Sequence, residues 1–198
     1  YNNLVSINYL NVENLTLGYG NNIVINNLNL SLESDKNYQI IGKNGVGKST
    51  LLSFISSNFQ GNVFSSIIRT ENIRILEISN LATIDSNLSL IENCFYFTQG
   101  KIPEEEIMLF LEQYGVHHFK EDLVQNFSSG MIKRSELAIA HIIDPEILCI
   151  DEPLNYLDKQ GVELLKILLA ERSKVGKSNI LSSQESINIF ENNYEMID

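Results

Sequence analysis

The sequence predicts a single α/β domain arranged around a phosphate-binding loop, and three observations lead to this prediction. Residues 42–50 read GKNGVGKST, which fits the pattern of Gly, four residues and then Gly-Lys-Ser/Thr. The apolar run 38–41 precedes the motif, and apolar residues at helical spacing follow it, as expected for the buried strand and the helix on either side of such a loop. A second apolar run, 147–150, ends in Asp151 and Glu152, which is typical of functional acids at the end of a buried strand.

Each residue type in the loop has a physical role. Gly42, Gly45 and Gly47 let successive backbone N–H groups turn inward without Cβ clashes, and the start of the following helix also favours an anion. We expect Lys48 to reach the β- and γ-phosphates and the Ser49 hydroxyl to bind Mg²⁺. The loop therefore predicts a site for a nucleoside triphosphate and Mg²⁺.

Length and composition fit one globular domain. The chain has 198 residues, of which 43% are apolar and 20% charged, and no apolar run approaches the roughly 20 residues needed to span a bilayer. The net charge of −11 argues against binding to a nucleic-acid backbone. Two cysteines without a Cys-x-x-Cys pair indicate reduced residues in or near the core, and two adjacent histidines without further ligands do not indicate a metal site.

The remaining elements follow from periodicity and turn signals. Residues 4–32 alternate like half-buried antiparallel strands around a glycine-rich turn at 18–22, and 61–78 read as short strands with a turn near 69–72. Tyr19 in the first turn could stack on an adenine base or simply pack the turn. The later segments predict a helix start at 88–93, helices over 103–114, 131–143 and 159–175, and a strand over 179–183.

The two acids that follow the apolar run 147–150 are expected to have different roles. We expect Asp151 to help hold Mg²⁺, and Glu152 to orient or deprotonate the attacking water. The alternative to these functional roles is that Asp151 and Glu152 only form an exposed acidic turn. A buried strand about a hundred residues after a phosphate loop favours the functional interpretation.

The motifs and their order resemble the nucleotide-binding subunits of ABC transporters, over nearly the whole chain. Residues 127–131 (FSSGM) resemble the family's signature, usually Leu-Ser-Gly-Gly-Gln, and Lys133-Arg134 continue it. Residues 148–153 (LCIDEP) resemble the second Walker motif, and 154–158 (LNYLD) resemble the loop that follows it and ends in Asp158.

The resemblance implies a P-loop NTPase with a RecA-like core and an N-terminal antiparallel β subdomain, together about 1–80 and 143–198, and an inserted helical subdomain at about 81–142. It favours Tyr19 as the adenine-stacking aromatic. It also implies a site completed by a second cassette, whose Ser128 and Gly130 would contact the γ-phosphate. The further nucleotide contacts that it implies are Asn44, Thr50, Asp158 and Asn80, the last of which would also sense the metal.

Several residues depart from the family pattern. Ser129 replaces a signature glycine, Met131 replaces its glutamine, and Asn80, or alternatively Glu77, aligns with the glutamine that senses Mg²⁺. Gln184 stands where the family has a catalytic histidine, and a glutamine can donate a hydrogen bond but cannot carry a proton. We therefore expect ATP binding to be retained and turnover to be reduced.

The resemblance predicts an ATP-hydrolysing subunit that dimerises on ATP, as a homo- or heterodimer, and moves a separate transmembrane permease. Such a subunit would be cytoplasmic and peripheral on the inner face of the membrane. Two alternatives stay open at this point. One is a degenerate cassette that regulates a partner without efficient turnover, and the other is a soluble ABC ATPase outside transport.

Overall fold

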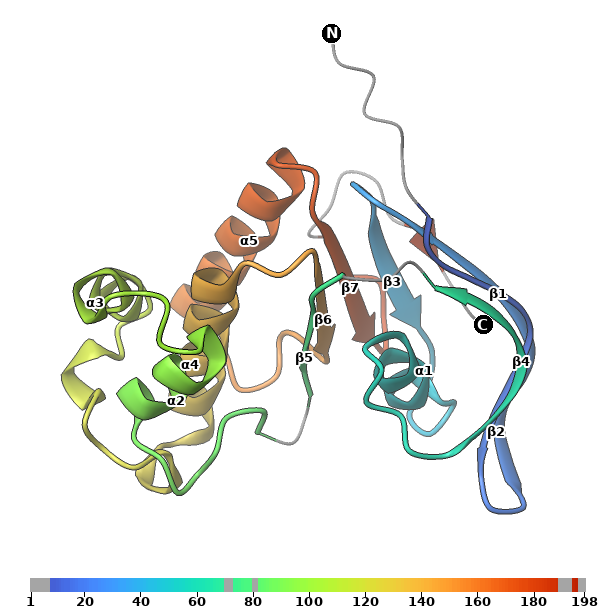
Figure 1. Ribbon diagram of the computed structural model, residues 1–198, viewed down its shortest axis with the longest axis horizontal. Coiled ribbons are helices and arrows are strands. Elements are labelled where there is room, and N and C mark those ends of the chain that lie inside the picture. The colour runs from blue at the N-terminus through green and yellow to red at the C-terminus, as the bar shows by residue number, and fades with distance from the viewer. Residues whose placement is uncertain (1–7, 70–72, 80–81, 189–193, 196–198) are drawn as a thin grey trace, which may run out of the picture. The chain divides into compact units, whose positions relative to one another are not determined.

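The chain forms two compact units in a computed structural model that describes residues 8–69, 73–79, 82–188 and 194–195 (Figure 1). The first unit comprises residues up to 77 together with 145–153 and the segment from 172 onward. The second comprises residues 78–144 and 154–171. The division of the chain at about 81 and 142 into subdomains stays a prediction.

The first unit contains an antiparallel sheet of three strands in the order β2-β1-β4. Its strands are β1 (Asn8–Tyr19), β2 (Asn22–Glu33) and β4 (Asn62–Arg69). Apolar residues of β1 and β2 are buried together in one core although the pairing register shifts at several points, and their turn pairs Tyr19 with Asn22. The prediction of antiparallel strands around a turn at 18–22 is confirmed, while most of the predicted turn at 69–72 lies outside the described residues.

The second sheet has five strands in the order β5-β6-β7-β3-β8. They are β3 (Asn37–Ile41), β5 (Ile75–Ile78), β6 (Ile147–Asp151), β7 (Ser178–Ser183) and β8 (Tyr194–Glu195). Strands β3, β6, β7 and β8 run parallel, so the carboxyl ends of β3, β6 and β7 meet at one edge. Helix α1 (Lys48–Ile55) contacts β1 of the first sheet and β6 and β7 of the second.

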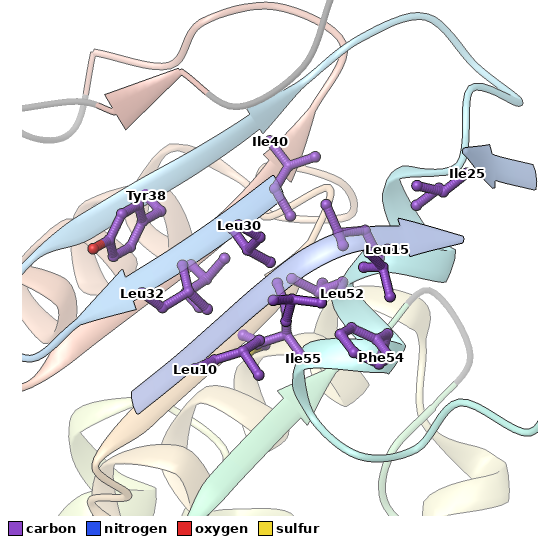
Figure 2. Close-up of a cluster of buried hydrophobic side chains, with 14 of the residues drawn as sticks. Leu10, Leu15, Ile25, Leu30, Leu32, Tyr38, Ile40, Leu52, Phe54 and Ile55 are labelled. Carbon is purple, nitrogen blue, oxygen red and sulfur yellow. The ribbon is translucent and has the colours of Figure 1, made fainter. Parts of the chain in front are cut away.

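One apolar core joins α1 to both sheets of the first unit (Figure 2). Leu52, Phe54 and Ile55 of α1 pack with leucines of β1 and β2 such as Leu15 and Leu30. Burying an aliphatic side chain of this size contributes about 1.5–3 kcal/mol. This core therefore holds α1, which is the helix that follows the phosphate loop, firmly against the sheets.

A polar network joins the amino-terminal ends of β3 and β7. The Asn179 side-chain amide donates to the Asn37 side-chain oxygen over 2.9 Å, and Asn179 in turn accepts from the Arg172 guanidinium over 2.8 Å. Arg172 is 2% exposed and also donates to the Ser178 carbonyl over 3.2 Å. Because buried polar groups are costly without partners, the network favours a single pairing register, in which Asn37 lies opposite Asn179.

The second unit is helical. It contains α2 (Leu90–Thr98), α3 (Glu104–Gln113), the short helices η1 (His117–Phe119) and η2 (Val124–Asn126), α4 (Ser129–Ile143), and most of α5 (Lys159–Lys174). The Ser89 and Glu92 side chains form a reciprocal capping box at α2, and Pro103 precedes the acidic first turn of α3. The predicted helices are confirmed within one or two residues at each end.

Two further findings bear on the composition. Cys94 and Cys149 are both buried and neither forms a disulfide, which confirms their predicted place in the core. In the part of the chain that the structure describes, no helix combines the length and the apolarity that crossing a bilayer requires.

Candidate nucleotide site

The three glycines of the loop between β3 and α1 are required for different reasons. Gly45 and Gly47 adopt φ angles of +82° and +108°, which L side chains rarely tolerate, and a Cβ on Gly47 would also lie 3.0 Å from the Val24 side chain. A Cβ on Gly42 would approach the Val46 side chain to 2.8 Å. The loop thus turns tightly at the carboxyl edge of the parallel sheet, where α/β proteins bind their ligands.

Lys48 lies inside the loop and is only 6% exposed. Its ammonium donates to the carbonyls of Gly42 and Lys43 over 2.9 and 3.3 Å, and it lies 3.6 Å from the Glu152 carboxylate. The loop carbonyls and Glu152 therefore compensate the burial of this charge. They also fix the Lys48 ammonium between the loop and the residue that follows β6.

Ser49 and Asp151 meet although they are 102 residues apart. The Ser49 hydroxyl donates to the Asp151 carboxylate over 2.7 Å, and the Ser182 hydroxyl of β7 donates to its other oxygen. Asp151 is 3% exposed at the end of β6. A hydroxyl and a carboxylate side by side are hard oxygen ligands of the kind that Mg²⁺ prefers, with phosphate and water completing its shell. The Ser49 hydroxyl and the Asp151 carboxylate therefore fit Mg²⁺. A different kind of metal site, built from three or more His, Cys, Asp or Glu side chains, does not occur among the described residues.

Glu152 follows Asp151 in the left-handed backbone region, with φ of +47°. Its N–H donates to the Ser182 carbonyl over 3.0 Å, which continues the β6–β7 pairing by one residue, and its side chain is 18% exposed. A non-glycine residue in this conformation costs about 1–3 kcal/mol, and such residues occur in turns and cluster at active sites. This turn brings the Glu152 carboxylate to Lys48.

The end of β7 carries Ser183 and Gln184. The Ser183 carbonyl accepts from the Gly42 N–H over 3.2 Å, and its hydroxyl donates to the Glu185 carbonyl over 2.6 Å. The turn after β7 is thus tied to the phosphate loop. Gln184 itself is exposed, and its contact with a γ-phosphate stays a prediction.

Tyr19 ends β1 and is 50% exposed. Its ring packs edge-on with Phe59, with centroids 5.2 Å apart and an interplanar angle of 65°. Asn44 is exposed on the loop, and Thr50 is half-buried in the first turn of α1. Asn80 lies outside the described residues. Nucleotide contacts of all four stay predictions.

The signature residues lie in the second unit, at the start of α4. Ser128 is the N-cap, and its hydroxyl accepts from the Met131 N–H over 3.3 Å, which leaves its proton for donation elsewhere. Gly130 is close to the backbone after β6, because a Cβ there would lie 3.1 Å from the Tyr156 carbonyl. Gly130 therefore has a packing role in this unit besides the predicted phosphate contact.

Asp158 has a capping role that the sequence reasoning missed. Its side chain accepts from the Gly161 N–H over 2.8 Å at the start of α5, and from Arg134 of α4 over 2.7 and 2.9 Å. The Gly161 N–H and the Arg134 guanidinium lower the pKa of the Asp158 carboxyl below its usual value. The pair connects α4 to α5, and the predicted contact of Asp158 with nucleotide is untested.

The sequence also did not predict a buried ion pair that follows the signature at 127–131. Lys133 and Glu136 of α4 lie 3.6 Å apart and are 4% and 3% exposed. Lys133 donates to the Ser79 carbonyl over 3.4 Å, and Glu136 accepts from the Thr83 N–H over 2.6 Å. Burial raises the pKa of the Glu136 carboxyl, although Lys133 opposes this shift. The pair lines a cavity of about 130 Å³.

Glu77, the alternative for the family's glutamine, is fully engaged with the end of α1. Its carboxylate accepts from the hydroxyls of Ser53 and Ser56 and from the Asn58 amide, over 3.0, 2.6 and 2.8 Å. The signal that could have identified this role is a single acid in an apolar strand, which needs donors when it is buried.

Comparisons with known proteins agree with this geometry. The family model described as "ABC transporter" matches residues 25–155. The lantibiotic transport ATP-binding protein SrtF of Streptococcus pyogenes is 30% identical over 88% of this chain and 79% of its own length. The bacitracin transport ATP-binding protein BcrA of Enterococcus faecalis is 28% identical over 92% of this chain and 63% of its own length.

Solved structures show the same architecture. A putative ABC transporter ATP-binding protein from Pyrococcus furiosus is 25% identical, with a TM-score of 0.75 over 94% of this chain and 96% of its own. An ATP-binding subunit of an ABC transporter shares the fold at 21% identity, with a TM-score of 0.77 over 88% of this chain and 79% of its own. The predicted P-loop α/β class is confirmed, and the chain belongs to the ABC transporter family, as an ATP-binding subunit that hydrolyses ATP.

Proposed function

We propose that this ATPase works as one of two cassettes that hold ATP between them and drive a separate membrane permease. The observation that carries the proposal is the meeting of Lys48, Ser49, Asp151 and Glu152 at one edge of the parallel sheet. ABC ATP-binding subunits pair with permease components, which would place this chain on the inner face of the membrane. Ser128 and Gly130 would contact the γ-phosphate bound by the other cassette.

The chain's own residues divide the work of hydrolysis. Lys48 would bind the β- and γ-phosphates, and the backbone N–H groups of the loop would bind phosphate oxygens. Ser49 and Asp151 would hold Mg²⁺, which neutralises charge on the phosphates when bound. Glu152 would accept a proton from the water that attacks the γ-phosphate, so that ADP and phosphate are released.

The ion pair between Lys48 and Glu152, with the two groups 3.6 Å apart, couples two of these roles. When ATP binds, Lys48 would turn from the Glu152 carboxylate to the β- and γ-phosphates. Glu152 is then freed to accept a proton. The ion pair thus supports a sequence in which the base becomes available only after nucleotide has entered.

Substitution of Glu152 by Gln tests both the catalytic role and the dimer. Glu152→Gln should lower ATP turnover at least about 100-fold, because a glutamine cannot accept the proton. It should also accumulate an ATP-bound dimer, measured by size-exclusion chromatography with light scattering in Mg-ATP. Glu163→Gln, an exposed change on α5, is the matched control and should behave like the wild type.

A Glu152→Gln variant that binds ATP but stays monomeric at high concentration would contradict a sandwich of two identical chains. The same measurement with a candidate partner cassette then tests a heterodimer. Wild-type turnover in Glu152→Gln would contradict the assignment of the base.

We further propose that Gln184 limits the rate of turnover. It is exposed at the end of β7, next to the turn that Ser183 ties to the phosphate loop. Gln184→His should raise turnover at least about 10-fold while the Kd for ATP stays similar, because a histidine can exchange protons. Gln184→Asn keeps an amide without a titratable group and is the control. An unchanged rate in Gln184→His, with ATP still bound, would favour a cassette that mainly regulates its partner.

A further inference from the structure

The turn after α1 brings an aromatic residue to the predicted nucleobase site. Phe59 lies between α1 and β4, and its ring packs with Tyr19, which ends β1. The ring centroids are 5.2 Å apart, within the range of favourable edge-to-face pairs. Tyr19 remains half-exposed, so part of its ring surface is open to a ligand.

The position of Phe59 is closely determined by hydrogen bonds. The N–H groups of Asn58 and Phe59 both donate to the Ser53 carbonyl, over 2.8 and 3.0 Å. The Asn58 side chain donates to Glu77 over 2.8 Å, and Glu77 is 7% exposed. The turn is therefore anchored both to the last turns of α1 and to β5.

Two glycines let the backbone pass close to this aromatic pair. A Cβ on Gly61 would lie 2.3 Å from the Phe59 ring and 2.3 Å from the Gly18 carbonyl. A Cβ on Gly18 would lie 2.5 Å from the Asn22 carbonyl. Phe59 and Tyr19 thus extend from backbone segments that are in close contact, which limits how far either ring can move.

We propose that Phe59 is a positioning residue for the nucleobase, which acts by restricting the ring of Tyr19. The interplanar angle of 65° means that Phe59 cannot lie parallel to a base stacked on Tyr19, so its effect passes through Tyr19. A ring that is already restrained loses less conformational entropy when a base stacks on it. The inference rests on the proposed stacking role of Tyr19.

The test compares Mg-ATP with Mg-tripolyphosphate, which has the triphosphate but no base, by calorimetry on the 198-residue chain. Phe59→Ala should raise the Kd for ATP about 3- to 10-fold and leave the Kd for tripolyphosphate unchanged. Tyr19→Ala should raise the Kd for ATP by at least as much. The variant with both changes should bind ATP no more weakly than Tyr19→Ala alone, because Phe59 then has no ring to restrain.

Phe59→Leu keeps apolar bulk in the turn and should give a Kd between those of the wild type and Phe59→Ala. Equal loss of ATP and tripolyphosphate binding in Phe59→Ala would overturn the inference in favour of a general folding role. So would an effect of Phe59→Ala that persists in the Tyr19→Ala background. If Tyr19→Ala binds ATP normally, base stacking itself fails and the inference with it, which differs from a failure at Phe59 alone.

Discussion

Lys48 and Lys133 are two buried lysines, one in each unit, with nearly the same set of partners. Each ammonium lies near a backbone carbonyl and 3.6 Å from a glutamate carboxylate. They are 6% and 4% exposed. Similar local chemistry therefore occurs once in the phosphate loop and once in the helix that begins at the signature.

The difference lies in the surroundings of the two glutamates. The Glu152 side chain is 18% exposed and stands at the edge of a glycine-rich loop, so its place beside Lys48 can be taken by a phosphate. The Glu136 side chain is 2% exposed and lies one helical turn from Lys133 on α4. Separating this second pair would leave a buried charge without compensation. Access to solvent, rather than the ion pair itself, therefore distinguishes Lys48, which we propose binds phosphate, from Lys133, which we assign a structural role.

The largest effect is expected from breaking the structural pair. Lys133→Met should lower the free energy of unfolding by about 3–5 kcal/mol, because Glu136 would stay buried without its cation. The variant Lys133→Met with Glu136→Leu should recover most of this loss. Urea denaturation measures both, with the exposed change Lys166→Met as control. If Lys133→Met and the double variant had the same free energy of unfolding, Lys133 would not differ from Lys48 in having a structural partner.

Removal of the binding lysine should affect ligand affinity instead of stability. Lys48→Ala should raise the Kd for Mg-ATP about 10- to 100-fold, since hydrogen bonds to charged groups contribute about 1.5–3 kcal/mol. Its unfolding midpoint in urea should change little, because Glu152 can reach solvent. Calorimetry with ATP and unfolding without it separate the two quantities. A large loss of stability with normal ATP binding would reverse the assignments of Lys48 and Lys133.

The smallest effect is a dependence of the free energy of unfolding on pH that Glu136 contributes. Burial raises the pKa of Glu136 in the folded state, so the folded chain binds more protons than the unfolded chain between the usual value of 4.5 and the raised one. The stability contribution of Glu136 should therefore rise as the pH falls from neutral into this window, and fall as the pH rises through it. The free energy of unfolding should be measured for the wild type and for Glu136→Gln from pH 4.5 to 7, and the difference between the two should show this slope. The opposite slope would mean that the Lys133 charge outweighs burial.

The same contrast shows how far the sequence reasoning could reach. Lys48, Asp151 and Glu152 were predictable because they stand at fixed positions beside apolar runs with a clear period. Lys133 and Glu136 were not, because two charges in a helical segment are normally assigned to its solvated face. Their burial depends on residues 79 and 83, which approach α4 only in the fold.

Other site residues were missed for related reasons. Ser182 was visible only as one polar residue in a strand, and its bond to Asp151 follows from the neighbouring order of β6 and β7. Phe59 stands in a turn without periodicity, so nothing in the sequence connects it to Tyr19 forty residues earlier. Asp158 was expected at the nucleotide, and its capping of α5 depends on the three-residue spacing to Gly161.

The pairing of β3 with β7 has a consequence for variants selected by loss of activity. At one end of this pair Asn37 bonds to Asn179, and at the other the Gly42 N–H bonds to the Ser183 carbonyl, about 13 Å away at 3.3 Å per residue. A slip of one residue would carry Ser182 away from Asp151 and turn every side chain of β7 to the opposite face. Random mutagenesis scored by transport should therefore recover substitutions at Asn179 and Arg172, which lie at the opposite end of the strand pair from the phosphate loop, among those at the loop itself.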